Sequence, residues 1–146
     1  MRILIVDDCS DDALFLEEAL TELVDGCEVL KLSDGYACMR LLKQGYRPDM
    51  VFIDLDMPLK NGLECIRDIR AINLLEDCPI MIYSCSHMMR NIAAAFMHGA
   101  KFYIVKPGSS YELKYLLERL LGQLHSTIGQ PDKSHFVIRQ QQLAVV

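Results

Sequence analysis

Charged or hydroxyl-bearing side chains directly follow four short apolar runs of this sequence. They are Asp7, Asp8, Asp54, Ser84 and Lys106. Carboxylates that lie close together repel one another, so the pKa of one of them rises unless a divalent cation relieves the repulsion. Ligand sets made only of oxygen suit Mg²⁺, which retains water and binds phosphate oxygens. A carboxylate held beside Mg²⁺ and a lysine can attack a phosphoryl group, whose oxygens the two cations neutralise.

The apolar runs that precede these residues predict the strands of a parallel sheet. Runs such as Ile3–Val6 and Met50–Ile53 contain no polar residue, which is typical of strands buried on both faces. We expect strands at 3–6, 27–32, 50–53, 80–83 and 102–105, with helices between them, one at 87–98, and a last helix at 110–124. Alternating strands and helices indicate an α/β fold with a doubly wound parallel sheet.

The carboxyl ends of parallel strands meet at one edge of such a sheet, where ligands bind. The central strand leads into Asp54, after which Pro58 stops the strand and Asn61 and Gly62 mark a turn into a helix. Polar residues commonly follow strands because strands end at the surface, so each candidate residue alone is weak evidence. Together they predict one site that combines carboxylates, a hydroxyl group and an ammonium group.

Composition narrows the classes of function. The 146 residues suit one domain, and no apolar run approaches the roughly 20 residues of a membrane span. The N-terminus has no signal-peptide pattern, so we expect a cytoplasmic protein. The net charge of −5 and the lack of a basic stripe argue against nucleic acid as a partner. The six cysteines show no CxxC pair and no zinc-like spacing, which indicates reduced core residues.

Over residues 1–124 the motifs and their order resemble the receiver domain of two-component response regulators. The residues that carry the resemblance are Asp7-Asp8, Asp54, Met57-Pro58, Asn61-Gly62, Ser84 and the run from Tyr103 to Pro107. The resemblance implies a CheY-like, flavodoxin-like fold with five helices and five strands in the order 2-1-3-4-5. It also implies a stand-alone signalling protein of a phosphorelay, not an enzyme, whose only chemistry is its own phosphorylation and slow dephosphorylation.

On this resemblance, Asp54 is the phosphoacceptor and Mg²⁺ is the cofactor. Asp8, Asp54 and the backbone carbonyl of Asp56 would bind the ion directly, and Asp7 would act mainly through water. The phosphoryl donor would be a sensor histidine kinase or a phosphotransfer protein, and the downstream target would be another protein that the sequence does not identify.

The resemblance also implies a switch beside the phosphoacceptor. Ser84 and Tyr103 would form a pair in which the aromatic ring turns inward as the hydroxyl group moves to the phosphoryl group. Lys106 would bind the phosphoryl oxygens, and a cis peptide, which costs little before proline, would join it to Pro107. Cys85 stands where the family usually has Ala or Gly, so we expect it to crowd the site; a redox role is the alternative.

The face made by the fourth helix, the fifth strand and the fifth helix is the expected surface for a target or for self-association. The fifth strand is expected at the edge of the sheet. Apolar residues expected to be exposed on this face are Met88, Met89, Tyr111 and Tyr115. Scattered surface residues without a function are the alternative interpretation.

We expect residues 125–146 to be a tail without an output domain, since the segment is short and has no recognition-helix pattern. The apolar run Phe136–Ile138 within it leaves two interpretations open. One is a disordered end, and the other is an arm that docks on a partner or forms a dimer contact.

Two other classes of protein share parts of this pattern. Asp54-Leu55-Asp56 follows a strand, as in phosphatases of the haloacid dehalogenase type, but there the paired acids come late in the chain, whereas here they come first. Release of phosphate from para-nitrophenyl phosphate would reveal such an enzyme. A flavin-binding module would need a Gly-, Ser- or Thr-rich loop after the first strand, where this chain has acids that repel phosphate. A coloured protein would reveal that class.

Overall fold

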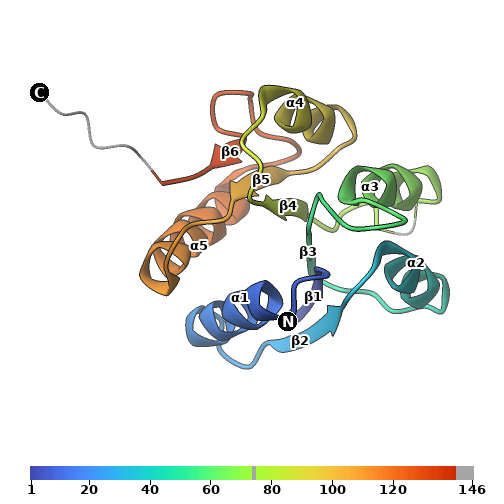
Figure 1. Ribbon diagram of the computed structural model, residues 1–146, viewed down its shortest axis with the longest axis horizontal. Helices are drawn as coiled ribbons and strands as arrows, with labels where there is room; N and C mark the ends of the chain where they lie inside the picture. Colours follow the sequence, from blue (N-terminus) through green and yellow to red (C-terminus); the bar gives the residue numbers. More distant parts are fainter. Residues whose placement is uncertain (74, 141–146) are drawn as a thin grey trace, which may run out of the picture.

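The unbroken apolar runs of the sequence form one parallel sheet in the order β2-β1-β3-β4-β5-β6 (Figure 1). The computed structural model describes residues 1–73 and 75–140. Within these residues the strands are β1 (Arg2–Val6), β2 (Glu28–Leu32), β3 (Met50–Ile53), β4 (Ile80–Ser84), β5 (Phe102–Val105) and β6 (Val137–Ile138). The helices are α1 (Ser10–Leu23), α2 (Gly35–Lys43), α3 (Gly62–Ala71), α4 (Met89–Met97) and α5 (Ser110–Ser126).

Helices cover both faces of the sheet, as the doubly wound α/β prediction requires. On one face, α1 and α5 lie side by side and bury Leu16 and Leu117 against Phe52 of β3. On the other face lie α2, α3 and α4, which bury residues such as Leu42 and Ile66 (Figure 1). Each fully buried aliphatic side chain contributes roughly 1.5–3 kcal/mol to folding, so the two apolar layers hold the strand ends in fixed positions.

The predicted strands and helices are present, with ends shifted by one or two residues. α4, for example, begins at Met89 instead of His87, and α5 continues to Ser126. The order 2-1-3-4-5 is confirmed, with β6 added beyond β5. Among the described residues, none of the helices is both long enough and apolar enough to cross a membrane.

The prediction that β5 lies at the edge of the sheet is wrong, because β6 pairs with it in parallel. Tyr103 lies opposite Val137, and Ile104 lies opposite Ile138. In each pair the two side chains join the same apolar layer, since neighbouring residues in register point to the same face. The short apolar run in the tail is thus used to complete the sheet of its own chain.

The tail returns from the end of α5 to the sheet, and residues 127–140 are hereafter called the C-terminal arm. Lys101 Nζ donates to the carbonyl of Thr127 at 2.8 Å. Gln130 Nε2 donates to the carbonyls of Phe96 and Ala100 at 2.7 and 2.8 Å. Phe136 is buried, so the described part of the tail is ordered against its own chain, and docking on a partner remains a prediction. Residues 141–146 lie outside the described residues.

The loop between β3 and α3 is fixed at both ends. Asn61 caps α3 in a capping box with Glu64, each side chain accepting a hydrogen bond from the backbone N–H of the other residue. A Cβ atom on Gly62 would overlap the backbone oxygen of Asp54, so only glycine lets the loop lie this close to the end of β3. The Asn-Gly pair therefore holds the loop beside Asp54.

Candidate functional site

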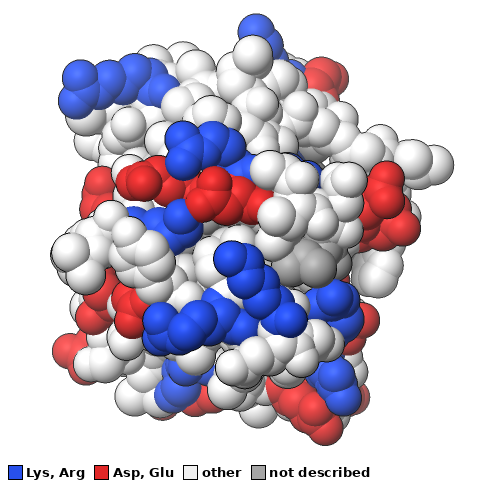
Figure 2. Space-filling model, turned by 90° about the vertical axis from the view of Figure 1, so that its right-hand side faces the viewer, with Lys and Arg blue, Asp and Glu red and all other residues white. Residues whose placement is uncertain are grey.

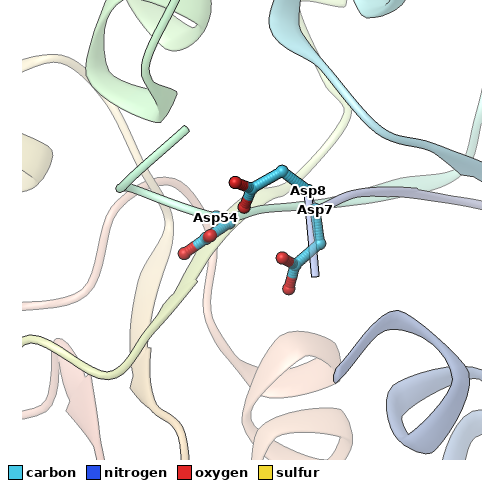
Figure 3. Close-up of side chains that lie close together, drawn as sticks. All are labelled: Asp7, Asp8 and Asp54. Atoms are coloured by element: carbon cyan, nitrogen blue, oxygen red, sulfur yellow. The ribbon is translucent and has the colours of Figure 1, made fainter. Parts of the chain in front are cut away.

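Three carboxylates converge at the carboxyl ends of β1 and β3. Asp7 and Asp8 follow β1 and Asp54 follows β3, and one oxygen of each lies within 4.8 Å of the others (Figure 3). The strand register brings them together, because Val6 pairs with Ile53 and the Asp54 N–H donates to the Val6 carbonyl at 2.8 Å. Asp7 and Asp54 are buried, whereas Asp8 is exposed. The predicted clustering of these acids is confirmed.

Lys106, at the end of β5, lies within the same cluster. Its Nζ donates to Asp7 Oδ2 and to Asp12 Oδ2, each at 2.9 Å, and lies 3.7 Å from Asp54 Oδ1. The ammonium group is therefore hydrogen-bonded to Asp7 and Asp12, and it lies close to Asp54 without a hydrogen bond to it. Nζ also lies 5.1 Å from the centroid of the Tyr83 ring, within the range of a cation–π interaction.

The charges of the cluster are coupled. Burial raises the pKa of Asp54 to about 7, Asp7 adds to this rise, and Lys106 opposes it. For Lys106 itself, burial lowers the pKa, but the hydrogen bonds with Asp12 and Asp7 outweigh burial and raise it above the ordinary value. A fixed cation thus stands beside a carboxyl group that burial makes reluctant to ionise.

Ser84 and Tyr103 meet through the backbone of Ser86. Ser84 ends β4, is fully buried, and its Oγ accepts a hydrogen bond from the Ser86 N–H at 3.1 Å. Tyr103 is also fully buried, and its hydroxyl group donates to the Ser86 carbonyl at 2.7 Å. The two predicted switch residues are thus linked by one peptide segment, and the ring of Tyr103 lies inward.

Two further predictions near the site concern the peptide bond before Pro107 and the backbone carbonyl of Asp56. The cis peptide before Pro107 is wrong, since every peptide bond in the described part of the chain is trans. The isomers differ by only about 0.5–1 kcal/mol before proline, so the Lys-Pro motif by itself does not fix the isomer, and Lys106 reaches Asp7 with a trans bond. Asp56 is exposed, and its backbone N–H bonds to Asp54; its carbonyl as a metal ligand remains a prediction.

Asp12 is the site residue that the sequence did not reveal. It lies in the first turn of α1, where an acid is explained by the helix dipole alone, and its partner is 94 positions away. It lines a cavity of about 270 Å³ together with Tyr83, Cys85 and Lys106. In the sequence, the only indication of this role is that Asp12 belongs to the acid-rich segment after β1.

Cys85 lies at this cavity and is exposed. Desolvation nevertheless raises the pKa of its thiol, which opposes formation of the reactive thiolate. Its environment therefore gives the redox alternative no support, while its place beside Lys106 agrees with the expected crowding.

Residues 3–118 match the family model described as the response regulator receiver domain. The chain belongs to this family. Receiver domains of this kind are CheY-like signalling modules of two-component systems, and not classical enzymes. The match contradicts the two alternatives, a haloacid dehalogenase-type phosphatase and a flavin-binding module.

Relatives and solved structures agree with the family. The receiver is 33% identical over 122 residues to a chemotaxis protein CheY homolog of Campylobacter jejuni, covering 84% of this chain and 93% of that protein. It is 32% identical over 126 residues to the transcriptional regulatory protein PrrA of Mycobacterium tuberculosis, covering 86% of this chain and 52% of that protein.

Among solved structures, the receiver resembles the phosphorylated cyanobacterial phytochrome response regulator RcpA. The TM-score is 0.78 at 26% identity, and the alignment covers 90% of this chain and 98% of that chain. It also resembles the Mn²⁺-bound form of response regulator Rcp1, with a TM-score of 0.76 at 25% identity, covering 89% and 98% of the two chains.

Proposed function

We propose that this receiver accepts a phosphoryl group on Asp54 with the help of Mg²⁺ and passes the signal on through its α4-β5-α5 face. The observation that supports the proposal best is the convergence of three carboxylates and Lys106 at the carboxyl ends of β1, β3 and β5. Receiver domains in general are phosphorylated by histidine kinases or phosphotransfer proteins, and these are the proposed donors here.

The donor set fits Mg²⁺, because it consists of carboxylate oxygens that lie close enough to share one ion. Asp8 and Asp54 would bind the ion through their side chains, Asp56 through its carbonyl, and Asp7 mainly through water. When bound, the ion would neutralise the carboxylates and the incoming phosphoryl oxygens. Asp54 gains most from this, since burial next to Asp7 raises its pKa in the metal-free protein.

In the proposed transfer, an oxygen of Asp54 attacks the phosphorus of a phosphohistidine on the donor. The oxygen–phosphorus bond forms as the phosphorus–nitrogen bond breaks, and the imidazole nitrogen keeps the electron pair. Lys106 Nζ, now 3.7 Å from Asp54 Oδ1, would bind a phosphoryl oxygen. The hydroxyl group of Ser84, whose Oγ accepts from the Ser86 N–H, would donate a hydrogen bond to another phosphoryl oxygen.

The proposed signalling face still offers apolar side chains beside the C-terminal arm. Met88 and Met89 are 47% and 74% exposed, and Tyr111 and Tyr115 are 85% and 53% exposed. Methionine and aromatic residues are enriched at protein interfaces, so this face suits a downstream protein or a second copy of the chain. The side of the molecule that carries α2 and α3 differs, because many of its exposed side chains are charged, with Lys and Arg near α2 and acidic residues around them (Figure 2).

The test of the phosphoacceptor uses acetyl phosphate as donor. We expect the parent protein to gain one phosphoryl group in Mg²⁺, and to gain none in EDTA. The Asp54→Asn variant should stay unmodified, since an amide cannot form the acyl phosphate. Intact mass before and after hydroxylamine treatment is the measurement. A mass gain that persists in the variant would show that the phosphoryl group is carried elsewhere.

A further inference from the structure

The C-terminal arm covers the residue that the proposed function uses as its switch. The ring centroid of Phe136 lies 6.5 Å from that of Tyr103 and 5.1 Å from that of Phe96 of α4, with the latter pair in an edge-to-face arrangement. The Tyr103 N–H donates to the Phe136 carbonyl at 3.0 Å. Phe136 is only 1% exposed and Tyr103 is fully buried, so Phe136 occupies the space next to the Tyr103 ring on the side of α4.

The far end of the arm lies near Lys106 and the loop that follows it. Arg139 and Gln140 line a cavity of about 690 Å³ together with Lys106, Pro107 and His87. Gln140 Nε2 donates to Glu112 Oε1 at 2.9 Å. The other carboxylate oxygen of Glu112 accepts from the Gly108 N–H at 3.3 Å, which ties the arm to the loop that follows Lys106. The arm therefore contacts both the inward-lying Tyr103 and the loop of the phosphate-binding lysine.

We infer that Phe136 is a positioning residue that holds Tyr103 inward, so that docking of the arm and occupation of Asp54 by a phosphoryl group favour each other. The inference rests on the proposed function, because it takes Tyr103 and Ser84 as the switch pair. Tyr103 donates to the Ser86 carbonyl and Ser84 Oγ accepts from the Ser86 N–H, so a ring fixed by Phe136 also fixes the segment that bonds Ser84. Outward rotation of Tyr103 requires release of the arm.

Linkage sets the direction of the effect. If the docked arm favours the state with Tyr103 inward, and the phosphoryl group favours the same state, each must strengthen the binding of the other by the same factor. A partner that needs the edge of β5 must first displace the arm, and thus competes with a part of this same chain. The coupling makes the arm a part of the switch.

The experiment titrates beryllofluoride with Mg²⁺ into the full chain, Phe136→Ala and Gln130→Ala. Hydrogen exchange of residues 129–140 reports arm docking, and the ¹⁹F spectrum of protein labelled with 3-fluorotyrosine reports the surroundings of Tyr103, assigned by the signal lost in Tyr103→Phe. In Phe136→Ala we expect faster exchange of the arm, a shifted Tyr103 signal and an apparent Kd for beryllofluoride raised about fivefold or more.

Two further variants separate this effect from loss of the fold. Gln130→Ala removes two hydrogen bonds of the arm but none of its apolar packing, and should change all three readouts in the same direction, by less. Ile128→Ala, at a fully exposed arm residue, should change none of them. An unchanged Tyr103 signal and an unchanged Kd in Phe136→Ala, despite a released arm, would overturn the inference alone. A parent protein that does not bind beryllofluoride would overturn the proposed function. In that case a Tyr103 signal that shifts in Phe136→Ala would still show that Phe136 positions Tyr103, but the coupling to phosphorylation would be lost.

Discussion

Asp54 gives the stability of the metal-free receiver a pH dependence of known sign. Its pKa rises from 3.8 to about 7 on folding, so the folded state holds the proton more tightly than the unfolded state. The protonated carboxyl stabilises the fold below about pH 4, and this contribution is lost as the pH rises through about 7. In EDTA we expect the parent to lose about 1–3 kcal/mol of unfolding free energy between pH 5 and 8 relative to Asp54→Asn.

Urea titrations of the two proteins at several pH values measure this difference. Added Mg²⁺ should restore stability to the parent, and by more at pH 8 than at pH 5, because the ion binds the ionised carboxylate. Asp54→Asn should respond to Mg²⁺ much less. A stability difference between the two proteins that stays constant from pH 5 to 8 would contradict the raised pKa.

Asp12 competes with Asp54 for Lys106. The ammonium group donates to Asp12 and to Asp7, each at 2.9 Å, and these bonds hold it 3.7 Å from Asp54 Oδ1. Asp12→Asn should weaken the first of these hydrogen bonds and increase the initial rate of phosphorylation by acetyl phosphate about two- to tenfold, since a charged hydrogen bond contributes roughly 1.5–3 kcal/mol. Asp11→Asn is the matched control, because it removes the same charge one residue away. Equal rates in the two variants would mean that only net charge matters.

Among the secondary-structure elements, Gly62 fixes the distance between α3 and the end of β3. Gly62→Ala would place a Cβ atom onto the backbone oxygen of Asp54, and we expect a loss of about 1–3 kcal/mol in unfolding free energy together with slower phosphorylation. Gly122→Ala in α5 is the control, since its Cβ meets nothing within 4 Å. That substitution should stabilise the protein by about 0.5–1 kcal/mol. Urea denaturation measures the unfolding free energy of both variants. If it changes with the same sign in both, the close approach of Gly62 to Asp54 is refuted.

The elements that the sequence predicted are those with strong local patterns. The four central strands are unbroken apolar runs, and their alternation with amphipathic helices fixes the parallel topology, which in turn brings Asp7, Asp8, Asp54 and Lys106 together. β6 has only two residues, and its apolar run is ambiguous until the neighbouring edge of β5 is known. Asp12 was missed for the same reason: its role depends on Lys106, which only the folded chain brings near.

At the scale of the whole molecule, the proposed signalling face predicts phosphorylation-dependent association. We expect sedimentation in beryllofluoride to show a larger species than the free protein, either a dimer or a complex with an added target protein. Tyr111→Ala/Tyr115→Ala should lower the proportion of that species, because both rings are exposed on the outer side of α5. Ile72→Ala, an exposed apolar residue at the end of α3, is the control. If all samples have the same mass and target binding is unaltered, this face is not the interface.

The pairing of β6 with β5 also bears on aggregation. An uncovered strand edge presents a row of free N–H and C=O groups on which a strand from another molecule can add. In the docked state the arm fills this edge, so the last strand that the structure describes offers only two residues for such growth. Release of the arm would expose four residues of a buried apolar strand, Phe102 to Val105, at once. If phosphorylation favours docking of the arm, as inferred above, the unphosphorylated chain exposes this edge more often and is the form more open to addition of a foreign strand.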